Sequence, residues 1–212
     1  MLRLEQLSVQ YGVLKAVNKV SLSIAPATIN VIEGHHGAGK SSLLQAIIGA
    51  VPAQGKVWLD QRLLNNRRSP AQLLRMGVVL VPEGRQVFAR LSTRENLQFG
   101  LHVSGQKGSI SEVLEYFPEL APLLDQPAYV LSGGQAQMLA MARALLSKPS
   151  YLLADEPWLG LSYGPRDRVW QVLTDLCSKG VGILVSGEHK VPTGAAIKQR
   201  KIMHNGNFEL GE

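Results

Sequence analysis

The amino-acid sequence predicts an α/β fold that forms one domain over residues 1–212. Three features support this prediction. Short apolar, β-branched runs alternate with amphipathic helical stretches in both halves of the chain. The N-terminal segments alternate apolar and polar residues, as half-buried antiparallel strands do. Between roughly residues 84 and 145 helical patterns prevail, which predicts a helical subdomain inserted between sheet-forming segments.

Strands are predicted where apolar residues alternate or form short runs. LRLEQLSVQY (2–11) and VSLSIA (20–25) alternate, so we expect them to form an N-terminal antiparallel β subdomain. TINVIE (28–33) is typical of a buried strand. KIMHNGNFEL (201–210) is predicted to be a hairpin, because Asn-Gly accepts the positive φ angles of a tight turn. Further strands are expected at KVWLD (56–60), MGVVLVP (76–82), YLLAD (151–155) and VGILVS (181–186).

Helices are predicted from apolar stripes and from the residues that flank them. KSSLLQAIIGA (40–50) follows a glycine-rich loop and places its leucines and isoleucines on one stripe. GGQAQMLAMARALLSKP (133–149) is a long amphipathic segment that ends at a proline. Further helices are expected at STRENLQFGL (92–101), SISEVLEYF (109–117) and PRDRVWQVLTDLCSKG (165–180).

The composition limits the class of protein. No apolar run approaches the roughly 18 residues that a membrane-spanning helix needs, and the N-terminus lacks the apolar region of a secretory signal. Cys177 is the single cysteine, so no internal disulfide can form, which is typical of a reducing compartment. The net charge of +6 fits an anionic partner, although a soluble basic protein without such a partner has the same charge.

The stretch EGHHGAGKSS (33–42) predicts a phosphate-binding loop between a strand and a helix. Glycines leave backbone N–H groups free to approach phosphate oxygens, which larger side chains would block. Lys40 would bring a positive charge to the β- and γ-phosphates, and the Ser41 hydroxyl would bind Mg²⁺. The predicted nucleotide-binding residues of this loop are Gly34, His35, His36, Gly37, Ala38, Gly39, Lys40, Ser41 and Ser42.

Two histidines inside this loop raise the alternative of a metal site. As metal ligands, His35 and His36 would need further partners, and no nearby cysteine or carboxylate cluster supplies them. We therefore expect their side chains to face outward while their amides face phosphate.

Two acidic residues end the apolar run YLLADE (151–156). Asp155 is placed to complete a Mg²⁺ shell, and Glu156 to polarise a water molecule for attack on a γ-phosphate. A solvated strand end is the alternative for such an acidic pair, but the preceding phosphate loop disfavours it.

The motif LSGGQ (131–135) predicts a second anion-binding helix end in the same chain. Its two glycines expose the backbone at the start of a long helix, and Ser132 adds a hydroxyl. One nucleotide has no evident use for two such ends from one chain, whereas two chains facing head to tail could each close the other's site. The predicted nucleotide contacts here are Ser132, Gly133, Gly134 and Gln135.

Together these motifs resemble the ATP-binding cassette family over nearly the whole chain. The resemblance implies a P-loop NTPase core (a RecA-like mixed sheet) with Glu156, His189 and Lys40 as catalytic residues. Tyr11, in VQYG, stands where that family stacks an aromatic ring on adenine. His189, in SGEHK, stands where the family keeps a histidine that contacts the γ-phosphate. The implied metal ligands are Ser41, Asp155 and Glu83.

A narrower resemblance is to the ATPase subunits of branched-chain amino-acid and urea-type importers. VLVPEGRQVFARLSTRENL (79–97), YFPEL (116–120) and DEPWLGLSYG (155–164) are similar to that branch. Glu83 stands where most cassettes have glutamine, and the branch often has glutamate there, in contact with Mg²⁺ or the attacking water. His36 and Trp158 depart from the usual pattern.

The resemblance implies an ATP-hydrolysing subunit of an importer that takes up a small polar solute. Two such subunits, identical or sister chains, would sandwich two Mg²⁺–ATP between them. They would bind membrane permease subunits at the cytoplasmic face of the inner membrane and serve an external solute-binding protein indirectly, with no nucleic-acid partner. The alternatives are a soluble cassette ATPase acting on ribosomes or DNA, which commonly carries two cassettes or a long coiled-coil insertion, and a small-molecule kinase, which has no use for LSGGQ.

Overall fold

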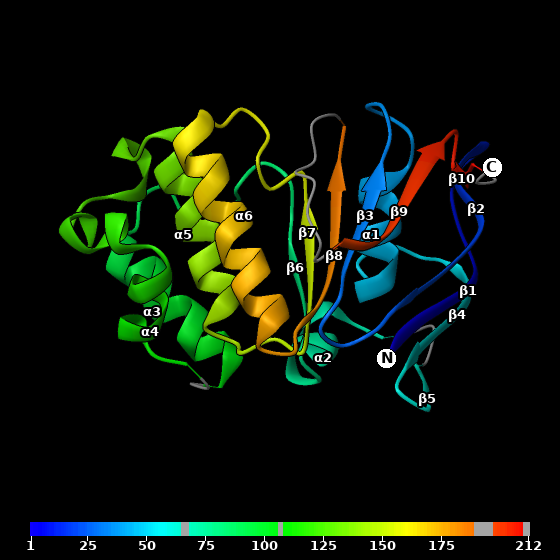
Figure 1. Cartoon of the computed structure of the whole chain (residues 1–212), viewed down its shortest axis with the longest axis horizontal. Coiled ribbons are helices and arrows are strands. Elements are labelled where there is room, and N and C mark those ends of the chain that lie inside the picture. Colours follow the sequence, from blue (N-terminus) through cyan, green and yellow to red (C-terminus); the bar gives the residue numbers. More distant parts are fainter. Residues whose placement is uncertain (65–67, 106–107, 189–196, 210–212) are drawn as a thin grey trace.

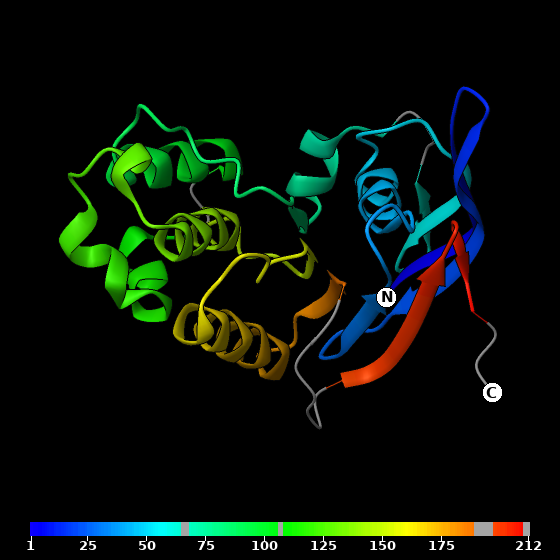
Figure 2. The ribbon, with the colours of Figure 1, turned by 90° about the horizontal axis from the view of Figure 1, so that it is seen from above.

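A computed structural model describes residues 1–64, 68–105, 108–188 and 197–209. Two β-sheets form one side of the molecule and a group of helices forms the other (Figure 1, Figure 2). The smaller sheet is antiparallel and has the strand order β2-β1-β4-β5. Its strands are β1 (Leu2–Tyr11), β2 (Leu14–Ile24), β4 (Gln54–Leu59) and β5 (Arg62–Leu64).

The larger sheet has the order β10-β9-β3-β8-β7-β6. All of its described pairings are parallel except that of β10 with β9. Every residue of β7 and β8 is buried, which is why these strands have continuous apolar sequences rather than alternating ones. The strands are β3 (Ile29–Glu33), β6 (Val78–Val81), β7 (Tyr151–Asp155), β8 (Gly182–Gly187), β9 (Ile197–His204) and β10 (Asn207–Phe208).

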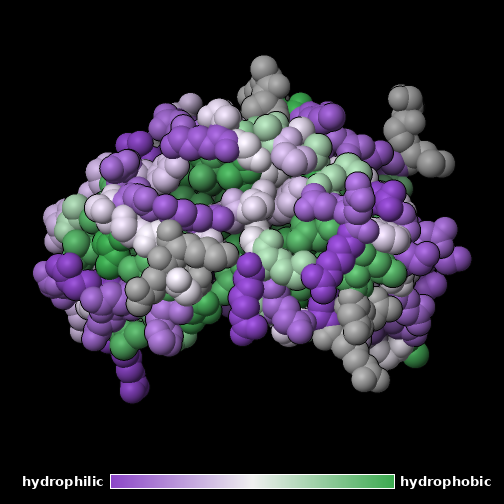
Figure 3. Space-filling model, turned by 90° about the horizontal axis from the view of Figure 1, so that it is seen from below, coloured by the Kyte–Doolittle hydropathy of each residue, from purple (hydrophilic) through white to green (hydrophobic). Residues whose placement is uncertain are grey.

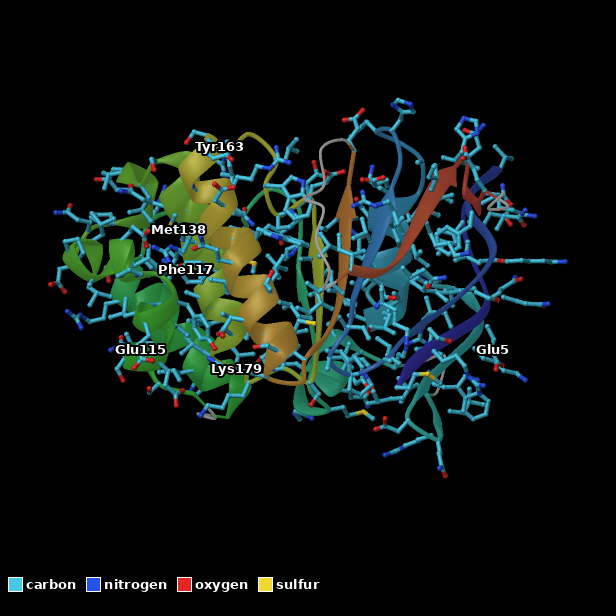
Figure 4. All side chains as sticks on the ribbon, viewed as in Figure 1. Glu5, Glu115, Phe117, Met138, Tyr163 and Lys179 are labelled. Atoms are coloured by element: carbon cyan, nitrogen blue, oxygen red, sulfur yellow. The ribbon has the colours of Figure 1, made fainter. Side chains whose placement is uncertain are left out.

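The helices pack in two apolar clusters. One cluster joins the first helix to the smaller sheet and to one face of the larger sheet. The other joins the opposite face to the helical group, where Phe117 and Met138 are buried (Figure 4). The elements are α1 (Lys40–Ile48), α2 (Pro70–Arg75), α3 (Thr93–Ser104), α4 (Ile110–Tyr116), α5 (Gly133–Leu145) and α6 (Tyr163–Ser178), with 3₁₀ turns at Pro118–Leu123 and Ala128–Val130.

The α/β fold class, the N-terminal antiparallel sheet and the long helix after LSGGQ are confirmed. The C-terminal hairpin also forms, with Asn205 and Gly206 at φ of 46° and 79°. Two elements were not predicted, β5 and α2. Helix α6 begins at Tyr163, before the predicted start, because Pro165 lies in its first turn, where the missing N–H is not needed.

No helix in the described part of the chain is long and apolar enough to cross a bilayer. Figure 3 shows one face of the molecule, where polar side chains cover most of the surface and apolar surface is broken into separate patches. The carboxyl ends of β3 and β8 lie at the upper edge in Figure 1, and Tyr163 marks the start of α6 near the same edge (Figure 4). Parallel sheets commonly bind ligands at this edge.

Candidate functional site

The glycine-rich loop leaves the end of β3 and enters α1 at Lys40. Gly37 and Gly39 have φ of 79° and 105°, values that glycine adopts without strain. Gly39 is the N-cap residue of α1, and no side chain there accepts a hydrogen bond from the first N–H groups of the helix. The start of α1 therefore keeps donors free for an anion, as a helix N-terminus that binds phosphate requires.

Packing also requires glycine at two positions of this loop. A Cβ atom on Gly34 would overlap the carbonyl oxygen of Met203 in β9, and one on Gly39 would overlap that of Ala16 in β2. The loop is thus fixed between a strand of the larger sheet and a strand of the smaller one.

A cavity of about 720 Å³ opens above this loop. This volume is in the range typical of small-molecule sites. Tyr11, which is 44% exposed, lines it, and Glu83 and Glu156 line it as well. The loop residues that line it are His36, Gly37, Ala38, Gly39, Lys40, Ser41 and Ser42; Gly34 and His35 line a separate cavity beside β9.

Lys40 is buried at the floor of the cavity and has three partners. Its Nζ donates to the carbonyl oxygens of Gly34, at 2.6 Å, and His35, at 3.0 Å. It also lies 3.1 Å from Oε1 of Glu156, and both side chains of this ion pair are more than nine-tenths buried. The loop therefore curls around its own lysine, whose charge is balanced by the acid from the end of β7.

Glu156 is held in a strained backbone conformation by its neighbours. Its φ of 46° is uncommon for a non-glycine residue, and such outliers cluster at functional sites. Its N–H donates to Oγ of Ser186 at 3.1 Å, and Ser186 donates to Oδ1 of Asp155 at 2.6 Å. The N–H of Glu188 donates to Oε2 of Glu156 at 3.2 Å. Both carboxylates are thereby fixed by β8 and the residue that follows it.

The donors for a magnesium ion can be tested against this geometry. Within the described residues no group of three or more histidine, cysteine or acidic side chains could hold a metal alone. Mg²⁺ commonly takes only one or two protein oxygens and completes its shell with water and substrate phosphates. Ser41 and Glu83 line the cavity and offer oxygen atoms of this kind, whereas Asp155 is buried, does not line the cavity and accepts a hydrogen bond from Ser186.

The two loop histidines differ in their surroundings. His36 is exposed and lines the cavity above Lys40. His35 points away from it, with Nδ1 3.6 Å from Oε1 of Glu188, a distance at which an ion pair forms when the imidazole is protonated. Both side chains are exposed, but only His35 lies away from the cavity above Lys40, whereas His36 lines it. The predicted switch residue His189 lies outside the described residues.

The LSGGQ segment begins α5 with a capping box. The Gln135 N–H donates to Oγ of Ser132 at 3.2 Å, and the Ser132 N–H donates to Oε1 of Gln135 at 2.9 Å. The hydroxyl hydrogen of Ser132 remains available for donation, because its oxygen acts only as an acceptor in these bonds. The N–H groups of Gly133 and Gly134 have no partner in the described part of the chain. None of residues 131–135 lines the cavity above Lys40.

Sequence reasoning missed Ser186, in β8, and Glu188, which follows β8. These two residues hold the acids at the end of β7. A serine at the end of an apolar strand gives no signal of its own. Trp158, a departure from the family pattern, is 6% exposed and packs edge-to-face on Trp170 at 6.5 Å. It acts as a core residue just after Glu156.

Comparisons with known proteins agree with this site. The family model described as "ABC transporter" matches residues 17–159. The chain is 33% identical to the high-affinity branched-chain amino acid transport ATP-binding protein BraG of Pseudomonas aeruginosa, over 99% of this chain and 91% of that protein. It is 36% identical to the probable branched-chain amino acid transport ATP-binding protein LivF of Archaeoglobus fulgidus, over 76% and 70%.

A solved structure, the ADP conformation of an ATP-binding cassette of an ABC transporter, superposes with a TM-score of 0.84 at 28% identity, over 99% of this chain and 89% of that one. The match of the family model covers well over half of the chain and includes the glycine-rich loop, LSGGQ and the two acids at the end of β7. The chain therefore belongs to the ABC transporter family, as one of its ATP-hydrolysing subunits.

Proposed function

We propose that this chain is the ATPase subunit of an importer and hydrolyses ATP in a nucleotide sandwich formed with a second cassette. The position of LSGGQ supports this proposal best. Its N–H groups do not line the cavity that holds Lys40 and Glu156 in the same chain. An exposed helix N-terminus attracts anions. A second cassette, identical or a sister chain, facing head to tail would bring this end onto the γ-phosphate of its partner.

In the proposed reaction Tyr11 stacks on the base, and the loop N–H groups and Lys40 bind the phosphates. Mg²⁺, held by Ser41 and Asp155 and neighboured by Glu83, would neutralise phosphate charge when bound. Glu156 accepts a proton from a water molecule whose oxygen bonds to the γ-phosphorus, while the bond from that phosphorus to the bridging oxygen breaks and ADP leaves with the electron pair. His189 would contact the γ-phosphate.

Substitution of the general base provides the test. The Glu156→Gln protein should bind ATP, hydrolyse it at least 100-fold more slowly than wild type, and elute as a dimer in ATP but as a monomer in ADP, by size-exclusion chromatography with light scattering. Lys40→Ala, which cannot hold the phosphates, is the control that should stay monomeric. Normal turnover by Glu156→Gln would remove Glu156 from the mechanism, and a monomer at saturating ATP would contradict a sandwich of two identical chains.

We further propose that the partners are membrane permease subunits at the cytoplasmic face of the inner membrane, bound by the helical subdomain of about 84–145. The solute would be a branched-chain amino acid or a urea-type amide, delivered by an external binding protein. The names of the relatives BraG and LivF support the amino acid. Uptake of labelled leucine and urea by cells lacking this chain, and by cells complemented with wild type or Glu156→Gln, would decide between them. Unchanged uptake of both solutes would contradict the solute class.

A further inference from the structure

Arg85 lies between two loops of the candidate site and has no polar partner among the described residues. It makes no hydrogen bond or ion pair to any of them. Its guanidinium occupies the space where a side chain at Gly133 would lie, since a Cβ there would be 2.7 Å from Nη2 and 3.1 Å from Nη1. The same Nη2 lies 3.8 Å from the Cβ position of Gly160, in the loop that follows Glu156. A cation that no described acid balances therefore touches the first glycine of LSGGQ.

The backbone that carries Arg85 is strained and held in place. Arg85 and Gln86 both have positive φ, 66° and 45°. Two consecutive non-glycine residues with positive φ cost conformational energy, and such a conformation persists only where the surrounding structure imposes it. Arg143 from α5 donates from Nη2 to the carbonyl oxygen of Gln86 at 2.7 Å, which ties the strained turn to the helix that LSGGQ begins. The turn that carries Arg85 is thus hydrogen-bonded to α5, the helix that begins with the glycines of LSGGQ.

From this geometry we infer that Arg85 is a catalytic residue that supplies a positive charge, in trans, to the γ-phosphate of the nucleotide on the partner cassette. The inference rests on the proposed sandwich. An anion bound by the N–H groups of Gly133 and Gly134 would lie beside the guanidinium, because Arg85 contacts Gly133 directly. Arginine binds phosphate with paired, charge-assisted hydrogen bonds. Charge on the transferred phosphoryl group is what such arginines stabilise, whether they come from the same chain or another.

Substitutions that separate charge from packing test the role of Arg85. Arg85→Met keeps an unbranched stem against Gly133 and Gly160 and removes the charge, whereas Arg85→Lys keeps the charge. We expect kcat for ATP hydrolysis to fall at least tenfold in Arg85→Met and less in Arg85→Lys, with thermal melting unchanged in both. Arg90, exposed in the same connecting segment, provides the matched control, and Arg90→Met should hydrolyse ATP like wild type. Equal activities for Arg85→Met and Arg85→Lys would overturn the inference.

A mixing experiment tests whether Arg85 acts on the partner's nucleotide. Lys40→Ala disables a chain's own site, so a dimer of Lys40→Ala with Arg85→Met has one complete site only if Arg85 serves the opposite chain. The mixture should then exceed the summed activities of the two variants. If Arg85 served its own nucleotide, both sites of that dimer would be defective and the mixture would gain nothing.

A second mixture keeps this inference distinguishable from the proposed function. Lys40→Ala mixed with Ser132→Arg tests the sandwich alone, because Ser132 belongs to LSGGQ. Recovery in both mixtures supports Arg85 acting in trans. Recovery with Ser132→Arg but not with Arg85→Met overturns the role of Arg85 and leaves the sandwich intact. Recovery in neither overturns a sandwich of identical chains, and the inference with it.

Discussion

Replacement of Ser186 by alanine should destabilise the chain more than the loss of an ordinary buried hydroxyl. Ser186 is fully buried, donates to the Asp155 carboxylate at 2.6 Å and accepts from the Glu156 N–H at 3.1 Å. A hydrogen bond to a charged group contributes about 1.5–3 kcal/mol and a neutral one about 0.5–1.5 kcal/mol. In Ser186→Ala the Asp155 carboxylate and the Glu156 N–H would each lose a hydrogen bond in a buried environment. We therefore expect Ser186→Ala to lower the free energy of unfolding by about 2–4 kcal/mol.

Urea denaturation of the nucleotide-free protein measures this loss, and Ser147→Ala is the matched control. Ser147 is 2% exposed but makes one neutral bond, to the Ala144 carbonyl at 2.7 Å, so its loss should cost about 1 kcal/mol. Because Ser186 also fixes the backbone of Glu156, kcat should fall in Ser186→Ala while Ser147→Ala leaves it unchanged. Equal destabilisation by the two variants would refute the role given to the Ser186 network.

Four further predictions concern stability and reactivity. Phe117→Ala removes the largest fully buried side chain among the described residues and should lower the free energy of unfolding in urea by about 3–5 kcal/mol. Arg68→Met removes hydrogen bonds to the Ala46 and Ile47 carbonyls at the end of α1 and should lower the melting temperature. Arg62→Met, at an exposed position, should leave the melting temperature unchanged. Burial raises the pKa of the Cys177 thiol above its usual 9.0, so a thiol reagent at pH 8 should modify the unfolded chain but not the folded one. The same shift stabilises the fold below pH 9.0, and this contribution should be lost as the pH rises through the folded-state pKa, but not in Cys177→Ala.

The sequence was most informative where backbone chemistry dictates residue type. A phosphate loop needs glycines between a strand and a helix, so its place could be predicted from spacing and apolar pattern alone. Helix α2 could also have been found, because Ser69 and Gln72 form a capping box with proline at the first helical position. β5 has only three residues, too few for a pattern. The contacts of Ser186 and Arg85 join segments distant in sequence, and nothing local to either residue specifies its partner.

Packing, as well as phosphate binding, favours glycine in the glycine-rich loop and in LSGGQ. This affects how substitutions of these glycines are interpreted. Side chains at Gly34 and Gly39 would overlap carbonyl oxygens of neighbouring strands, and those at Gly133 and Gly134 would crowd Arg85 and Pro165. A loss of activity at any of these four positions could therefore follow from displaced strands or helices.

Gly37 is different, because a Cβ there has nothing within 4 Å and only its φ of 79° disfavours alanine. Gly37→Ala should cost about 1 kcal/mol of stability through backbone strain. It places a methyl group on the loop that faces the phosphates, so its effect on ATP affinity should exceed its effect on unfolding. If calorimetry showed the same ATP affinity for Gly37→Ala as for wild type, close approach of phosphate would not be the reason for glycine at position 37.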